Sequence, residues 1–381
     1  MIEKDRMPMN HCPDITLCMI VRNEEDVLSS CLASAAPLVE EIVVVDTGSS
    51  DRTKEIAKQY TEQVIDFKWH DDFAQARNFA LKQASREWVL WLDADEEIRL
   101  EDEQEWTQSF LKASAAYDAL LVPLRNYYGE TPDETKAYLY SSYRLLRASA
   151  GFQFKQAIHE HLDIASGSNR YAEAPLSGMC IRHYGYLDAY VQKKDKIHRN
   201  LHLLLKEKSR PGYDPWIDYH IANELYQQRD YSGAFEHVNL AIRRFIDHGR
   251  LPPSLAYKLK YEILLITESL DHALEGIEKA IMLYPDYVDL HYYKGLITYR
   301  NGCYTDAIDV FTRCMEMGEN CRHLVLHGTG SYMSEYMIGM SQEAMGEMDK
   351  AIGLYERLMR KYPGFEAPRE RLEVLKEITE N

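Results

Sequence analysis

Long hydrophobic runs are missing from this chain of 381 residues: no apolar stretch approaches the roughly 18 residues that a membrane-spanning helix needs. Residues 1–13 lack the apolar core of a secretory signal peptide, and we expect them to be loosely ordered. The seven cysteines are odd in number and show no C-x-x-C spacing, which favours free thiols in a reducing compartment. These absences predict a soluble, cytoplasmic protein without a transmembrane segment.

Positive charge is also scarce. Lys and Arg number 44 against 61 Asp and Glu, so the formal net charge is −17. Such an acidic chain is poorly suited to non-specific binding of nucleic acid or anionic lipid, although a local basic pocket stays compatible with a phosphate. The length and the 45% hydrophobic content predict two folded domains, each with its own core.

The first half of the chain alternates short apolar runs with helical patterns, and it has neither G-x-G-x-x-G nor G-x-x-x-x-G-K-[ST]. This alternation predicts an α/β domain with a mostly parallel sheet. Without a glycine-rich phosphate loop, a nucleotide diphosphate would have to be held by a metal ion and by side chains. The predicted strands are 15–21, 42–45, 64–65 and 88–92, and the helices between them are 26–35, 51–60 and 72–84.

Polar clusters follow three of these strands, at Arg22-Asn23-Glu24, Asp46–Asp51 and Asp93–Asp95. In a parallel sheet such strand ends face a common crevice, where ligands bind. Asp93 and Asp95 are two residues apart, so their carboxylates project to the same side of a strand. Hard cations such as Mg²⁺ or Mn²⁺ prefer oxygen ligands and bridge to substrate phosphates. The pattern predicts a cation site; the alternative is an acidic loop after a strand.

Four stretches of this half resemble, in order and spacing, the donor half of an inverting, GT-A-type family 2 glycosyltransferase. They are I-V-R-N-E-E (20–25), I-V-V-V-D-T-G-S-S-D-R-T (42–53), D-F-A-Q-A-R-N-F-A (72–80) and W-V-L-W-L-D-A-D-E (88–96).

This resemblance implies roles for individual residues. Asp46 would contact the uracil or ribose of a UDP-sugar, and Asp93 would lie near the ribose and the metal. Asp95 would ligate the Mg²⁺ or Mn²⁺ that bridges the diphosphate, and Arg77 would line the nucleotide pocket. The same pocket would include Arg22 and Glu24. A purely structural role is equally open for Glu24 and Asn78.

After residue 96 the sequence predicts a strand at 117–124, a loop at 127–135 and apolar stretches at 143–147 and 152–162. His159-Glu160-His161 lacks the H-E-x-x-H spacing of a zinc peptidase. With the later His183-Tyr184 pair, this half resembles the bacterial branch that has a fused repeat domain, as in the sublancin-type peptide S-glycosyltransferases.

That resemblance makes Glu160 the general base, with His159 beside it, and His183 a further metal ligand. The alternative for His183 is a core histidine bonded to a backbone carbonyl. Arg144 and Arg147 would face the diphosphate or, alternatively, form salt bridges on the sheet surface.

The second half is helical and repetitive. A helix at 187–208 ends at Arg210-Pro211-Gly212, a strong helix breaker. Four later segments each begin with an alanine that has an apolar or aromatic residue four positions on. Their spacings of 39, 34 and 44 residues approach the tetratricopeptide period of about 34, with inserts predicted at 248–253 and 321–330 and a last helix at 366–379. The alanines are Ala234, Ala273, Ala307 and Ala351.

The predicted organisation is a flexible N-terminus (1–13), a GT-A domain (14–186), a connecting helix (187–212) and a tetratricopeptide domain (213–381). We expect a metal-dependent transfer from a UDP-sugar to a Cys or Ser/Thr side chain of a peptide or protein that the repeats recruit, with a homodimer through the repeats as a further expectation. The alternatives are transfer to a cell-surface saccharide or lipid-linked sugar, and a non-enzymatic scaffold. The concave face is expected to carry tyrosines, with ordinary packing between helices as the alternative for at least half of them. They are Tyr219, Tyr226, Tyr257, Tyr292 and Tyr293.

Overall fold

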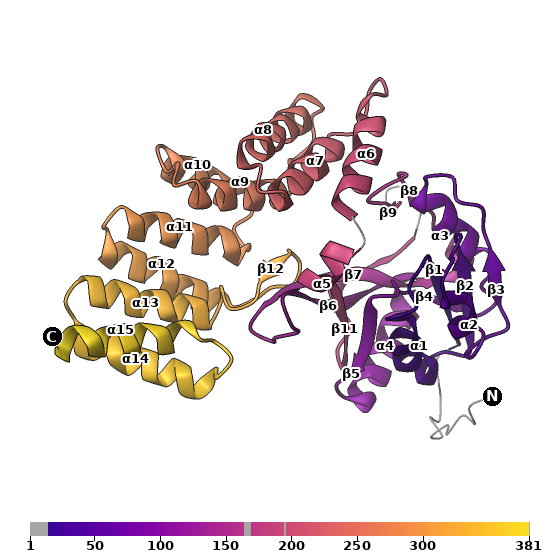
Figure 1. The fold of residues 1–381 in the computed structure, drawn as a ribbon, viewed down its shortest axis with the longest axis horizontal. Coiled ribbons are helices and arrows are strands. Elements are labelled where there is room, and N and C mark those ends of the chain that lie inside the picture. The colour runs from indigo at the N-terminus through magenta and orange to yellow at the C-terminus, as the bar shows by residue number, and fades with distance from the viewer. Residues whose placement is uncertain (1–13, 164–168, 194–195, 381) are drawn as a thin grey trace. The chain divides into compact units, whose positions relative to one another are not determined.

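The computed structural model describes residues 14–163, 169–193 and 196–380, so the N-terminal segment expected to be loosely ordered lies outside the described residues. The chain divides into two compact units (Figure 1). The first comprises the residues up to Tyr127 together with Tyr140–Lys193. The second comprises the repeats after Lys193 together with Tyr128–Leu139, a short segment that the sequence order alone would assign to the first unit.

The first unit contains the predicted parallel sheet. Its strands run in the order β3-β2-β1-β4, and each neighbouring pair is parallel. Asp72 caps the helix that leads into β4, because its side chain accepts a hydrogen bond from Gln75 N. The strands are β1 (Ile15–Val21), β2 (Glu41–Asp46), β3 (Val64–Asp66) and β4 (Trp88–Trp91), and the helices are α1 (Leu28–Ala35), α2 (Thr53–Ala57) and α3 (Phe73–Leu81).

Beyond β4 the sheet is mixed, because β10 pairs with β6 in parallel register while other pairs are antiparallel, so the expectation of a mostly parallel sheet is wrong there. β7 pairs with β4 in antiparallel register, and β11 pairs with β5 in the same way. A direct return of the chain without a crossover helix gives antiparallel neighbours, as in the hairpin of β6 and β7, where residues 119–147 have no helical pattern. These elements are α4 (Glu103–Ala116), α5 (Asp188–Lys193), β5 (Glu96–Leu100), β6 (Ala119–Gly129), β7 (Ala137–Arg147), β8 (Phe154–Lys155), β9 (His161–Leu162), β10 (Tyr171–Pro175) and β11 (Met179–Leu187).

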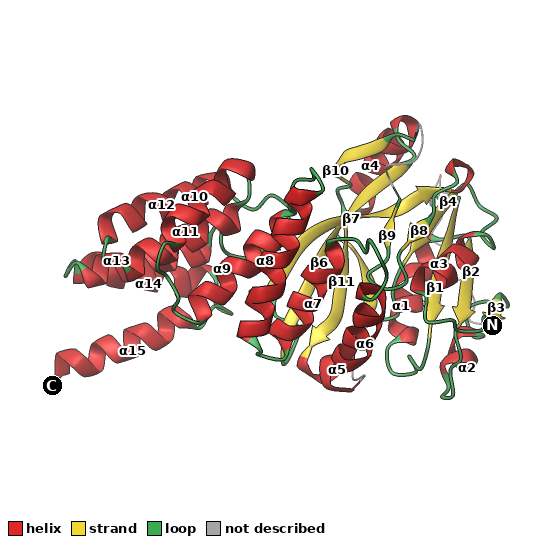
Figure 2. Cartoon of the chain, turned by 90° about the horizontal axis from the view of Figure 1, so that it is seen from above, coloured by secondary structure: helices red, strands yellow, loops and turns green. Residues whose placement is uncertain are grey.

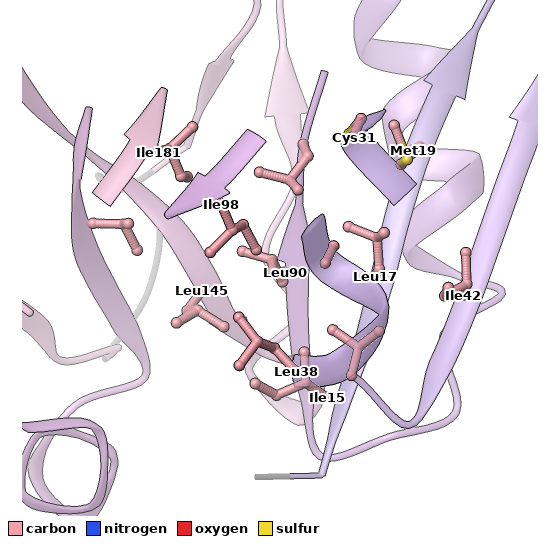
Figure 3. Close-up of a cluster of buried hydrophobic side chains, with 14 of the residues drawn as sticks. Ile15, Leu17, Met19, Cys31, Leu38, Ile42, Leu90, Ile98, Leu145 and Ile181 are labelled. Atoms are coloured by element: carbon pink, nitrogen blue, oxygen red, sulfur yellow. The ribbon is translucent and has the colours of Figure 1, made fainter. Parts of the chain in front are cut away.

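The larger core cluster of this unit lies between α1 and the sheet (Figure 3), and a smaller one involves α3. Leu17, Leu90 and Leu145 come from β1, β4 and β7, and all three are buried. Cys31 of α1 is fully buried among them, and burial raises the pKa of its thiol well above the ordinary value. The six cysteines of the described residues are free thiols, as expected for a chain without a disulfide framework.

The second unit is built from helix pairs (Figure 2). All four predicted alanines lie in the second helix of a pair and are buried, so the repeat pattern is confirmed. The predicted helix 187–208 is divided between α5 and α6, and residues 194–195 are outside the described residues. The helices are α6 (Lys196–Lys208), α7 (Trp216–Gln227), α8 (Tyr231–Asp247), α9 (Ser254–Ile266), α10 (Ala273–Leu283), α11 (Val288–Arg300), α12 (Tyr304–Met317), α13 (Tyr332–Ala344), α14 (Met348–Lys361) and α15 (Ala367–Glu380).

The tip of the β6–β7 hairpin packs on the repeats. The predicted insert at 321–330 contains β12 (Val325–Leu326), whose two residues pair with Leu139 and Tyr138. Asp289 of α11, fully buried, fixes this insert by accepting hydrogen bonds from Leu326 N at 3.0 Å and Thr329 Oγ1 at 2.8 Å. The insert is therefore an additional strand that holds the hairpin tip.

The tyrosines expected on an open concave face are mostly packing residues. Tyr219, Tyr292 and Tyr293 are buried, while Tyr226 and Tyr257 are half-buried. The hydroxyl of Tyr293 accepts a hydrogen bond from buried Lys258 at 3.0 Å. Among the described residues, no helix is long and apolar enough to cross a membrane.

Close crossing of the paired helices depends on glycine, and this gives a first prediction. A Cβ at Gly295 would lie 2.6 Å from the Phe311 ring, so Gly295→Ala overpacks the α11–α12 contact. We expect a loss of about 1–3 kcal/mol in the free energy of unfolding, measured by urea denaturation. Gly353→Ala is the matched control, because a Cβ there meets nothing within 4 Å, and it should stabilise α14 by about 0.5–1 kcal/mol. Equal changes in the two variants would contradict the close-crossing role of Gly295.

Candidate functional site

The ends of β1, β2 and β4 lie at one edge of the parallel sheet. Val21 is the register partner of Asp46, and Thr47 N donates to Val21 O at 2.9 Å. Asp46 is 1% exposed, and its Oδ1 accepts hydrogen bonds from Gly48 N at 2.9 Å and Ser49 N at 2.8 Å. Its Oδ2 is buried and has no hydrogen-bond partner among the described residues. A buried carboxylate oxygen without a donor is costly, so this atom is suited to accept a hydrogen bond from a ligand.

The loop after β1 is tied to the loop after β2. Asn23 Oδ1 accepts from Ser50 N at 2.8 Å, and Glu24 N donates to Thr53 Oγ1 at 2.8 Å. Arg22 is exposed beside these contacts. The structure therefore brings the first two predicted clusters together, and it gives Glu24 a backbone role in joining them.

Arg77 of α3 lies at the centre of the site and is buried. Its Nη2 donates to Asp93 Oδ1 at 2.7 Å, and its Nε donates to Glu160 Oε1 at 2.5 Å. Burial lowers the pKa of the guanidinium, but the two carboxylates outweigh that effect and raise it. Burial raises the pKa of Asp93, but Arg77 and Arg144 overcome that effect and hold it below its ordinary value. The structure thus joins the predicted donor carboxylate to the predicted base through one cation.

Trp91 at the end of β4 lies against two guanidinium groups. The Arg77 carbon Cζ is 4.5 Å from the ring centroid, and the Arg144 Cζ is 3.6 Å from it. The indole Nε1 donates to Tyr143 O at 2.9 Å, which fixes the ring plane. Cation–π contacts of this kind are strongest when desolvated, as they are here. Trp91 therefore supports both buried cations.

Arg144 forms a bidentate ion pair with Glu96, at 3.0 Å to Oε2 and 2.6 Å to Oε1. Both side chains are buried, so the salt-bridge alternative describes Arg144, although the pair lies inside the unit and not on the sheet surface. Glu96 Oε2 also accepts from Asp93 N at 2.9 Å. The pair thereby shapes the turn that carries Asp93 and Asp95. A direct contact between Arg144 and a nucleotide sugar stays a prediction.

Asp95 and His183 lie side by side, with Asp95 Oδ1 3.5 Å from His183 Nε2. The other ring nitrogen, Nδ1, is 2.9 Å from Asn126 Oδ1. Burial lowers the pKa of His183, but the Asp95 carboxylate outweighs this effect and raises it. The ring nitrogens of His183 therefore face two side chains, whereas the alternative prediction for this residue is a bond to a backbone carbonyl.

The Asp95–His183 pair fits a divalent cation. Gly185 lies beside it, and a Cβ at that residue would be 2.5 Å from His183 Nε2 and 2.6 Å from Asp95 Oδ2, so the glycine keeps the space between the two donors open. In the described part of the chain no group of three or more His, Cys, Asp or Glu could hold an ion. A cation here would take its remaining ligands from water and substrate phosphates, as Mg²⁺ usually does.

The segment with His159 and Glu160 is held against α3. Asn78 clamps β8 by donating to Phe154 O at 2.9 Å and accepting from Phe154 N at 2.8 Å, a structural role. Phe73 N donates to Ala157 O at 2.8 Å. His159 has a φ of 51°, in the left-handed region, and is half-buried. Glu160 is directed to Arg77, and His159 precedes it in the chain.

Sequence reasoning did not single out Trp91, Glu96, Asn126 or Gly185 as site residues. The first two stand inside the motif W-V-L-W-L-D-A-D-E, and an acidic residue directly after D-x-D is a usable signal for a paired cation. Asn126 and Gly185 carry no local signal, because each acts through a segment distant in sequence.

Residues 16–172 match the model of glycosyl transferase family 2, and residues 334–364 match a tetratricopeptide repeat model. The chain therefore carries a family 2 glycosyltransferase domain followed by tetratricopeptide repeats, which confirms the family and the fold class predicted from the sequence.

Individual relatives share this architecture in part. A TPR repeat-containing protein of Synechococcus elongatus is 30% identical over 275 residues, which are 70% of this chain and 66% of that protein. The prophage-derived glycosyltransferase SunS of Bacillus subtilis is 25% identical over 241 residues, 61% of this chain and 54% of SunS. The lipopolysaccharide core biosynthesis glycosyltransferase LpsC of Rhizobium meliloti is 34% identical over 155 residues, 37% of this chain and 54% of LpsC. The matches thus leave a third to nearly half of each relative uncovered.

The buried Arg144–Glu96 pair gives a second prediction. Glu96→Gln leaves the Arg144 guanidinium buried without its counter-charge, so we expect a loss of about 3–5 kcal/mol in the free energy of unfolding by urea denaturation. Asp66→Asn is the control, because its pair with Lys54 is exposed and should be of no measurable consequence. A Glu96→Gln protein as stable as the wild type would show that the pair is not needed to hold the turn after β4.

Proposed function

We propose that this protein is a metal-dependent, inverting glycosyltransferase that moves a sugar from a UDP-sugar to a Cys or Ser/Thr side chain of a peptide or protein. The observation that supports this most strongly is the arrangement at the end of β4. Arg77 joins Asp93 to Glu160, and the Asp95–His183 pair lies after the same strand. Donor binding and acceptor activation are thus provided by neighbouring groups, as a single displacement at the sugar carbon requires.

The donor would be held by oxygen acceptors and by the cation. Asp46 Oδ2, buried without a partner among the described residues, would accept from the uracil or from a ribose hydroxyl. Asp93 would bind the ribose while Arg77 keeps it ionised. Mg²⁺ or Mn²⁺, held by Asp95 and His183, would supply positive charge to the diphosphate as it leaves. No glycine-rich phosphate loop is available for that purpose in this sequence.

Glu160 would remove the acceptor proton. Its side chain is 12% exposed, and one carboxylate oxygen is bound by Arg77 at 2.5 Å, which fixes the orientation of the other. A base must lie within hydrogen-bond reach of the proton it takes, so fixed orientation favours catalysis. His159, on the adjacent position, is the alternative base.

The repeats are the basis for proposing a peptide or protein as the acceptor. Helical repeat arrays present extended surfaces that suit a peptide better than a monosaccharide. The hairpin tip 128–139 already packs on this unit, so a peptide would bind the surface that the tip leaves free. The similarity to LpsC, a lipopolysaccharide core biosynthesis glycosyltransferase, favours a second candidate, a saccharide acceptor of the bacterial surface. Incubation with a UDP-sugar and either a peptide mixture or lipooligosaccharide, read by mass spectrometry, separates the two.

Removal of the cation is the direct test of the donor site. In a screen of UDP-sugars with Mg²⁺ or Mn²⁺, Asp95→Ala should lower donor hydrolysis and transfer at least about a hundredfold, because a ligand of the cation is lost. Excess chelator should have the same effect on the wild type. Glu101→Gln, an exposed carboxylate a few residues on, is the control. Full activity in chelator would contradict metal dependence, and no affinity for UDP by calorimetry would contradict the donor class.

The role of Glu160 as base is tested with two kinds of acceptor, a hydroxyl and a Cys thiol. Glu160→Gln should slow transfer to a hydroxyl by about 10²–10⁴-fold, because a general base typically contributes that much. A Cys thiol, with a pKa of about 8.5, ionises without help as the pH rises, so transfer to Cys should recover toward about pH 9. UDP affinity should stay unchanged as the control. A variant with full activity on hydroxyl acceptors would move the role of base to His159.

A further inference from the structure

We infer that Gly185 determines whether this site can hold a cation, because its missing side chain leaves open the space between His183 Nε2 and Asp95 Oδ2. The inference rests on the proposed function and adds to it a residue that neither binds substrate nor ligates the ion. It names the ligand as a hard divalent cation, bound together with the diphosphate of the nucleotide.

The space beside Gly185 is bounded by two donor atoms. A Cβ built on Gly185 would lie 2.5 Å from His183 Nε2, 2.6 Å from Asp95 Oδ2 and 3.2 Å from Asp95 Cγ. Carbon atoms do not approach nitrogen or oxygen so closely without a covalent bond, whereas divalent cations lie about 2.0–2.6 Å from such donors. The position that any side chain at residue 185 would fill is therefore at coordination distance from both donors.

Backbone conformation does not explain the glycine. Gly185 lies within β11 and is not among the residues with positive φ, so an alanine could adopt its backbone angles. In a strand, glycine costs stability and often marks a close approach of another group. Here the close approach is that of the two predicted metal ligands.

His183 and Asp95 are each fixed by a further hydrogen bond, so neither can readily move away from a side chain at residue 185. Asn126, which is buried, binds His183 Nδ1 at 2.9 Å and leaves Nε2 as the nitrogen that faces Asp95. Asp95 is fixed through its backbone, because Tyr184 N donates to Asp95 O at 3.0 Å. A methyl group at 185 would separate the donors or occupy the place of the ion.

The test is Mn²⁺ binding, measured by calorimetry and by electron paramagnetic resonance of free Mn²⁺, with and without UDP. Gly185→Ala should raise the dissociation constant for Mn²⁺ in the presence of UDP by about 10–100-fold, the range seen when the surroundings of metal ligands are altered. His183→Ala is the comparison that removes a ligand outright. Gly353→Ala, with open space around its Cβ, is the matched control and should bind as the wild type does.

The outcomes separate this inference from the proposed function. If the wild type binds Mn²⁺ and His183→Ala does not, but Gly185→Ala binds normally, the role of Gly185 is overturned and the cation site stands. If the wild type fails to bind Mn²⁺ with UDP, the metal-dependent function itself fails, and with it this inference.

If circular dichroism shows that Gly185→Ala does not fold, a second measurement can be made on the wild-type protein. Fe²⁺ substituted for Mg²⁺, with ascorbate and peroxide, generates radicals that cut the backbone beside the ion. We expect cleavage of the wild-type protein near residues 93–96 and 183–186, mapped by mass spectrometry and suppressed by excess Mg²⁺. Cleavage confined to other segments would overturn the placement of the cation beside Gly185.

Discussion

The double ion pair of Arg77 is the interaction on which the site depends. A single buried guanidinium holds Asp93 and Glu160, which are 16 and 83 residues away from it in the sequence. Two carboxylates this close would repel each other if the cation were absent, and one would take up a proton. Because Arg77 is positioned by α3 and Asp93 by β4, the geometry of the predicted base is set by the most regular part of the fold.

A second buried guanidinium, that of Arg144, supports the same site indirectly. Arg144 and Glu96 pair inside the unit, and Trp91 lies against both guanidinium groups. Such buried charges seldom add net stability when compared with apolar residues of equal size. Their contribution here is orientation: Glu96 binds Asp93 N, so the turn that carries both aspartates has one preferred shape. The proposed cation site, with only two protein ligands, would need that precision, because a small displacement would separate them.

The two units do not divide where the sequence changes character. The segment 128–139 leaves the sheet as the continuation of β6 and returns as the start of β7, yet it packs with the repeats. β12 extends the sheet by pairing with its end, and Asp289 fixes β12 from α11. The irregular spacing of 44 residues between the last two alanines is explained by this strand. An insertion in a repeat array is thus a sign of a contact, here with a hairpin from the other half of the chain.

The sequence by itself determined the α/β alternation, the carboxylates at the strand ends, the repeats and the family, because each depends on local periodicity or on short motifs. Helix and strand periods, and alanines at helix crossings, are properties of a few neighbouring residues. Only the tertiary structure decided the antiparallel half of the sheet, the partner of Arg144, the bond between Asn126 and His183, and the space beside Gly185. Each of these joins segments far apart in the chain, and which segments meet is decided by the free energy of the whole fold, not by any local pattern.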